Sequence, residues 1–93
     1  MPYASVVHVR LTAGQAAGET MLREQLVPRM KTQSGFQGAN FFRSPDGTTG
    51  MGVVLFDTEE HAKAGHDAMV NDRPPEAPPV TSSGIYEMFL AVE

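Results

Sequence analysis

The sequence predicts one α+β domain whose elements follow one another in the order βαββαβ. Three observations lead to this prediction: stretches that alternate like strands, two stretches with helical periodicity, and turn residues between them. A chain of 93 residues and 10.0 kDa has room for one hydrophobic core. We therefore expect a single domain over residues 1–93.

The first strand is expected over Tyr3–Leu11, because apolar and polar residues alternate there. Its odd-numbered residues, such as Val7 and Val9, should face one side of the sheet. Its even-numbered residues Val6, His8 and Arg10 should face the other side.

The first helix is expected from about Gln15 to Gln33, where Leu22, Leu26 and Met30 recur every four residues and form one apolar stripe. Pro28 interrupts this pattern, since proline lacks the N–H that would bond to the carbonyl of Glu24. We expect a kink or a new helical turn at this point.

A β-hairpin is expected next, with strands over Gly38–Arg43 and Thr49–Phe56. The residues Ser44-Pro45-Asp46-Gly47 supply a proline with fixed φ and a glycine that tolerates positive φ, which is typical of a tight turn. Asp57, followed three residues later by Glu60, suggests a capping box that opens a second helix reaching about Asn71.

The remaining chain is expected to hold an extended connector and a last strand. Residues Arg73–Pro79 include four of the seven prolines, which excludes a helix or a central strand. The last strand is placed over Gly84–Val92, which is rich in apolar residues. With right-handed crossovers, these elements form a ferredoxin-like plait: a four-stranded antiparallel sheet with both helices on one face.

The second face of this sheet is also apolar, although two helices can cover only one face. Both alternating sets of Met51–Phe56 are apolar, and the same holds for the last strand. We therefore expect a homodimer in which the two open faces pack together as a dimeric α/β barrel. Six residues are assigned to this dimer interface: Val6, His8, Arg10, Met51, Val53 and Leu55. The alternative is a monomer with a few exposed aliphatic side chains.

Composition excludes several classes of function. The net charge is −4, with 7 Lys and Arg against 11 Asp and Glu, which argues against nucleic-acid binding. The absence of Cys excludes thiolate catalysis and a disulfide scaffold, and no metal cluster or cofactor motif is recognisable. The apolar stretches are far shorter than a membrane span, and the chain does not start like a signal peptide. We expect a cytoplasmic protein without cofactor or metal.

Few side chains suggest chemistry. Asn40, Tyr86 and His66 are the catalytic candidates, because an amide or phenol can stabilise an oxyanion and an imidazole can move protons near neutral pH. A structural role for each stays the alternative. Apolar residues are assigned to a ligand pocket: Val7, Val9, Phe42, Phe56 and Met69. The methionines and phenylalanines could line such a pocket or fill the core.

Three stretches resemble the antibiotic biosynthesis monooxygenase family of the dimeric α/β barrel superfamily. They are Gly35-Phe36-Gln37-Gly38-Ala39 after a helix with Leu26-Val27-Pro28, the junction Leu55–Glu60, and Tyr86-Glu87-Met88. The resemblance implies a ligand pocket between helices and sheet, and cofactor-independent oxidation of aromatic substrates. The family's haem degraders carry an Asn where this chain has Val7, and a Trp that this chain lacks, so haem degradation is not expected.

Two functions remain open. The first is a homodimer that binds a small apolar or aromatic molecule and oxidises it without a cofactor, with Asn40, Tyr86 or His66 assisting proton removal. The second is a dimer that binds a ligand or serves as a scaffold without catalysis.

Overall fold

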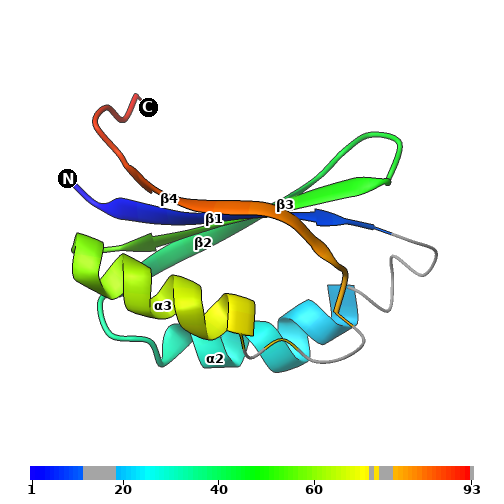
Figure 1. The fold of residues 1–93 in the computed structure, drawn as a ribbon, viewed down its shortest axis with the longest axis horizontal. Helices are drawn as coiled ribbons and strands as arrows, with labels where there is room; N and C mark the ends of the chain where they lie inside the picture. Colours follow the sequence, from blue (N-terminus) through cyan, green and yellow to red (C-terminus); the bar gives the residue numbers. More distant parts are fainter. Residues whose placement is uncertain (12–18, 72, 74–76, 93) are drawn as a thin grey trace.

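In the part of the chain that the structure describes, four antiparallel strands form one sheet, and the helices lie on the same side of it (Figure 1). The computed structural model describes residues 1–11, 19–71, 73 and 77–92. Its elements, in chain order, are β1 (Tyr3–Arg10), η1 (Leu22–Leu26), α2 (Val27–Lys31), β2 (Phe36–Arg43), β3 (Thr49–Phe56), α3 (Glu59–Asn71) and β4 (Val80–Glu87). The strand order β2-β3-β1-β4 is that of the ferredoxin-like plait, so the predicted fold class is confirmed.

Strand pairing fixes which residues share a face. Ser5 on β1 lies opposite Val54 on β3 and Ile85 on β4, and its hydroxyl bonds to His66 of α3, so these residues define the helix-covered face. The neighbouring set, with Val6 opposite Val53 and Gly84, lies on the other face, which we call the open face. The predicted alternation of the first strand is confirmed.

The core lies between α3 and the sheet. Phe56 is fully buried, and its ring meets Phe36 edge to face at 6.5 Å. Ala62 and Gly65 give α3 a slim surface over this ring, and a side chain at Gly65 would collide with Phe56. The small residues at this spacing therefore let α3 pack closely on the strands.

The interruption predicted at Pro28 takes the form of a wider helical turn. Helical structure runs from residue 19, but over η1 the N–H of Val27 reaches back to the carbonyl of Leu22, five residues earlier. Pro28 then occupies the first turn of α2, where its missing N–H costs little. The predicted helix start near Gln15 lies outside the described residues.

The hairpin turn is confirmed in detail. Gly47 has a φ of 74°, and its N–H donates to the carbonyl of Ser44 at 2.9 Å. Asp46 Oδ1 accepts bonds from the Ser44 hydroxyl and from the backbone and side chain of Thr48. These three donors lower the pKa of Asp46 to about 2.

Two local predictions are wrong. The cap of α3 is Thr58, whose hydroxyl accepts the N–H of His61 at 3.1 Å, whereas Asp57 binds the His61 ring. The last strand begins at Val80 and ends at Glu87, so it starts four residues earlier than predicted and excludes Met88–Val92. That apolar segment leaves the sheet on the side opposite the helices (Figure 1).

Candidate ligand-binding site

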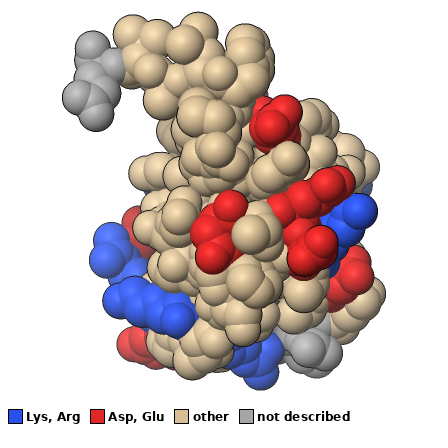
Figure 2. Space-filling view, turned by 90° about the vertical axis from the view of Figure 1, so that its left-hand side faces the viewer, with Lys and Arg blue, Asp and Glu red and all other residues tan. Residues whose placement is uncertain are grey.

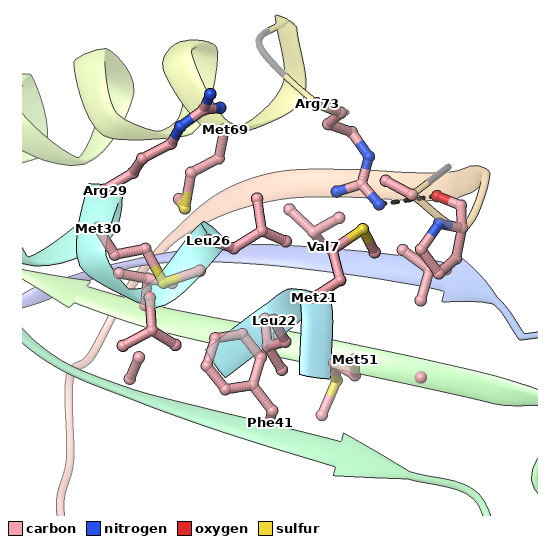
Figure 3. Close-up of a pocket in the computed structure, with 18 of the residues that line it drawn as sticks. Val7, Met21, Leu22, Leu26, Arg29, Met30, Phe41, Met51, Met69 and Arg73 are labelled. Atoms are coloured by element: carbon pink, nitrogen blue, oxygen red, sulfur yellow. Dashed lines mark hydrogen bonds between the residues drawn. The ribbon is translucent and has the colours of Figure 1, made fainter. Parts of the chain in front are cut away.

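A cavity of about 1170 Å³ lies between the first helical segment and the sheet. Its walls come from η1 and α2 on one side and from β1, β2 and β3 on the other, and Met69 of α3 closes one flank (Figure 3). Because α3 packs closely on the strands and η1 and α2 do not approach any strand as closely, space remains under the first helix. This volume lies slightly above the range of about 300–1,000 Å³ that is usual for small-molecule sites.

Flexible apolar side chains dominate the wall. Six of those around the centre are Val7, Met21, Leu22, Leu26, Met30 and Met69, and Phe41 lies beside Leu22 (Figure 3). Thioether side chains have several rotatable bonds and adapt to irregular shapes. This wall can therefore enclose an apolar molecule without imposing one rigid outline.

The wide turn of η1 contributes directly to this wall. Leu22 and Leu26 lie at its two ends, and both line the cavity. Turns of this kind hold one residue more than an α-helical turn and occur often at functional sites. Here the turn follows from Pro28, which cannot continue the ordinary bonding pattern.

Basic side chains surround the apolar wall. Glu19 lies 3.4 Å from the Arg43 guanidinium and 3.8 Å from that of Arg23. Arg73 is half-buried and donates from Nη2 to the carbonyl of Pro78 at 2.7 Å. Burial lowers the pKa of Arg73, because the charged guanidinium has lost part of its hydration.

The structure places the predicted pocket residues in two environments. Val7, Val9, Phe42 and Met69 border the cavity, whereas Phe56 is not among its lining residues and belongs to the core. Phe42 pairs with Met51 across the strands and is 54% exposed, so it belongs to the open face. Phe41, on the opposite side of the same strand, is the phenylalanine whose ring lies on the helix-covered face, against Gly52.

The three catalytic candidates do not converge. Tyr86 is 58% exposed and lies opposite Ala4 on the open face. Asn40 borders the cavity, but it is exposed and lies opposite Val53 on the open face. His66 is part-buried and holds the buried Ser5 hydroxyl through Nδ1 at 2.6 Å, and it is not among the cavity residues.

All six residues assigned to the dimer interface lie on the open face. Val6, Met51, Val53 and Leu55 are half-buried by their sheet neighbours, while His8 and Arg10 are exposed. His8 Nδ1 lies 3.2 Å from the Ser82 hydroxyl on β4. The placement on one face agrees with the alternation, and the dimer itself stays a prediction.

Acidic groups gather at the end of the molecule that carries the start of α3 (Figure 2). There Glu87 accepts the Tyr3 hydroxyl at 3.3 Å and raises the pKa of Tyr3 through its negative charge. The ring of His61 lowers the pKa of Asp57 through a hydrogen bond of 2.6 Å. The uncharged segment 88–92 projects above this end.

Within the described ranges, no group of three or more His, Asp and Glu residues could hold a metal ion. None of the described helices is both long and apolar enough to cross a bilayer.

Sequence reasoning missed the importance of Arg73. It lies at the start of the proline-rich segment that was expected to be an extended connector, and the structure places Arg73 and residues 77–79 along the cavity. The sequence does contain one signal for this role. Arg73 is a single arginine just after the second helix, near the end of the first strand.

The four-stranded antiparallel plait is shared with solved structures of antibiotic biosynthesis monooxygenase-like proteins, which confirms the resemblance at the level of fold. No protein-family model matches the chain, and no curated protein matches it by sequence.

Three solved structures illustrate this likeness. A monooxygenase of Streptomyces coelicolor, from the gene ActVA-Orf6 and in complex with nanaomycin D, has a TM-score of 0.69 at 15% identity, over 98% of this chain and 90% of that one. SnoaB, a cofactor-independent oxygenase of Streptomyces nogalater, has a TM-score of 0.75 at 10% identity, over 98% and 96%. A haem-degrading protein of Mycobacterium tuberculosis has a TM-score of 0.68 at 19% identity, over the whole of both chains.

Proposed function

We propose that this protein is a homodimer that binds a small apolar or aromatic molecule between its first helix and its sheet. The cavity of about 1170 Å³, walled by methionine and leucine side chains, is the observation that carries the proposal. Burial of apolar ligand surface there supplies roughly 25 cal/mol per Å² removed from water. The likeness of fold to a monooxygenase in complex with nanaomycin D supports the binding of a small organic molecule.

The second part of the proposal is that the open face of the sheet forms the interface of the homodimer. Large apolar side chains on the open face and on segment 88–92 are exposed in the single chain, including Phe42, Tyr86, Phe89 and Leu90. Packing two open faces together removes this surface from water by one twofold contact. The expectation of a cytoplasmic protein stays a prediction.

Binding is tested with Nile red, a neutral dye that fluoresces in apolar surroundings. The wild type is expected to bind it saturably. Val7→Phe fills the cavity and should weaken binding about tenfold or more, since displaced ligand surface returns to water. Ala64→Phe, on the exposed side of α3 and outside the cavity lining, is the matched control and should leave dye binding unchanged. Equal binding by both variants would place the dye elsewhere.

Cofactor-independent oxidation of the bound molecule is the second candidate, supported by the fold shared with SnoaB. In such a reaction a base removes a proton from an activated CH₂ group, and the carbanion passes electrons to O₂. The products are a ketone and water, so one anthrone and one O₂ give one quinone and one water.

The positions of the candidate residues favour binding without catalysis. Of Asn40, Tyr86 and His66, only Asn40 borders the cavity, and an amide is not a base at neutral pH. Oxygen uptake with a panel of anthrones and quinols separates the two candidates. Uptake above the rate without protein, lost in Val7→Phe, supports the oxygenase; uptake at the rate without protein leaves binding as the function.

A further inference from the structure

Charge is distributed unevenly between the cavity and the rest of the molecule. Four of the seven Lys and Arg residues line the cavity, namely Arg23, Arg29, Arg43 and Arg73. Among the residues that the structure describes, Glu19 is the one carboxylate there, although the chain has 11 Asp and Glu and a net charge of −4. A cavity with this positive bias attracts anions and disfavours cations.

Arg73 is the basic side chain that points over the apolar wall. Its guanidinium lies above Val7 and next to the thioether of Met21 (Figure 3). Its hydrogen bond to the Pro78 carbonyl uses one of five N–H donors, and no described carboxylate lies within ion-pair distance of it. Arg43 and Arg23, in contrast, share Glu19.

A half-buried cation with no carboxylate beside it among the described residues is costly, and a bound anion would offset this cost. The lowered pKa of Arg73 also reflects this loss of hydration. The guanidinium nevertheless stays protonated throughout the neutral range. Two parallel N–H donors of arginine fit the two oxygens of a carboxylate. The apolar wall beside the guanidinium fits a hydrophobic body attached to that carboxylate.

We infer that the ligand of this cavity is an apolar organic acid, with its carboxylate on Arg73 and its hydrophobic body on the Met21, Leu22 and Leu26 side of the wall. This inference rests on the proposed function, since it names the substrate class of the same cavity. It adds a specificity determinant: the ionised acid binds, and its neutral analogue of equal size binds more weakly.

The test compares two probes that differ only at the polar group, 2-naphthoic acid and 2-naphthamide, by titration calorimetry at pH 7. The wild type should bind the acid about 10- to 100-fold more tightly than the amide, the range for hydrogen bonds to charged groups. Arg73→Met keeps an apolar stem but no charge and should bind both probes equally. Lys63→Met removes one positive charge from the exposed side of α3, outside the cavity lining, and should keep the preference.

Two further measurements keep the result interpretable. Circular dichroism shows whether Arg73→Met is folded, and Arg73→Lys, which keeps the charge but loses the two-pronged geometry, should retain a reduced preference for the acid. Equal affinity of the wild type for acid and amide would overturn the inference and leave the proposed function standing. A preference that survives Arg73→Met would also overturn it. Failure of Nile red and of both probes to bind would overturn the proposed function itself.

Discussion

The two faces of the same sheet use apolar residues in different ways. On the helix-covered face, Phe56 and Val54 are almost fully buried and fix the position of α3. On the open face, the large side chains of Phe42 and Tyr86 are more than half exposed. The difference teaches that the alternation of side chains along a strand assigns residues to the two faces. Burial within one chain then depends on whether helices cover that face.

The largest effect is expected at the core of the covered face. Phe56→Ala should lower the free energy of unfolding by about 3–5 kcal/mol, because it removes a fully buried ring and leaves a cavity. Urea denaturation measures this loss. Phe42→Ala is the matched variant, with an expected loss of about 0.5 kcal/mol within one chain. A larger loss at Phe42 that shrinks on dilution, as the wild-type dimer dissociates, would report its burial in the dimer.

The next effect concerns the open face as a whole. Sedimentation should give twice the chain mass of 10.0 kDa for the wild type and a single chain, or unfolded chain, for Val53→Asp, because a charge is forced into the proposed interface. Ala64→Asp, on the exposed side of α3, is the control and should keep the mass of the wild type. A folded Val53→Asp variant of unchanged mass would show that the interface is elsewhere.

Substitutions at two glycines compare the packing of the two faces, with smaller expected losses of stability. Gly65→Ala should destabilise the protein by about 1–3 kcal/mol, since the added methyl group meets the Phe56 ring, despite the better helix propensity of alanine. Gly38→Ala on the open face has no atom within 4 Å of the added methyl group and should change stability little. Thermal unfolding of both variants measures the difference. Equal losses would mean that the open face is packed as tightly as the covered one.

The smallest effect is expected in the turn between β2 and β3. Hydrogen bonds from Ser44 and Thr48 lower the pKa of Asp46 from 3.8 to about 2. A lowered pKa gives a contribution to stability that is complete above pH 4 and is lost as the pH falls towards 2. NMR titration of the Asp46 carboxyl measures the pKa directly, and Ser44→Ala should raise it. An Asp46 pKa near 4 in the wild type would contradict the observed geometry.

Most of the fold could be predicted from the sequence, because the residues that begin and end its elements act locally. Pro28, the Ser44–Gly47 turn and the alternation of β1 each act through neighbouring residues. The position of β4 depends on a distant partner instead. The polar residues Ser82 and Ser83 join the sheet through backbone pairing with β1, whereas the apolar segment after Glu87 extends past the start of that strand.

The site was less predictable for a similar reason. Phe41 and Phe42 are adjacent aromatic residues, so composition cannot say which one faces the helices, and the register shift between Phe36 and Gly38 decides it. Arg73 acquires its environment from Pro78 and from a helix about 50 residues earlier in the chain. Local sequence patterns contain no information about such long-range contacts.

The wide turn of η1 also makes the shape of the site depend on residue number. Each helical residue turns the chain by about 100°, so deleting one residue between Leu22 and Leu26 would let the helix return to regular bonding and rotate the helical residues before it by that angle. Met21 would then move away from Arg73. Side chains from the neighbouring face of the helix would replace it in the apolar wall of the cavity. A single insertion or deletion here would remodel the recognition surface while leaving the strands untouched.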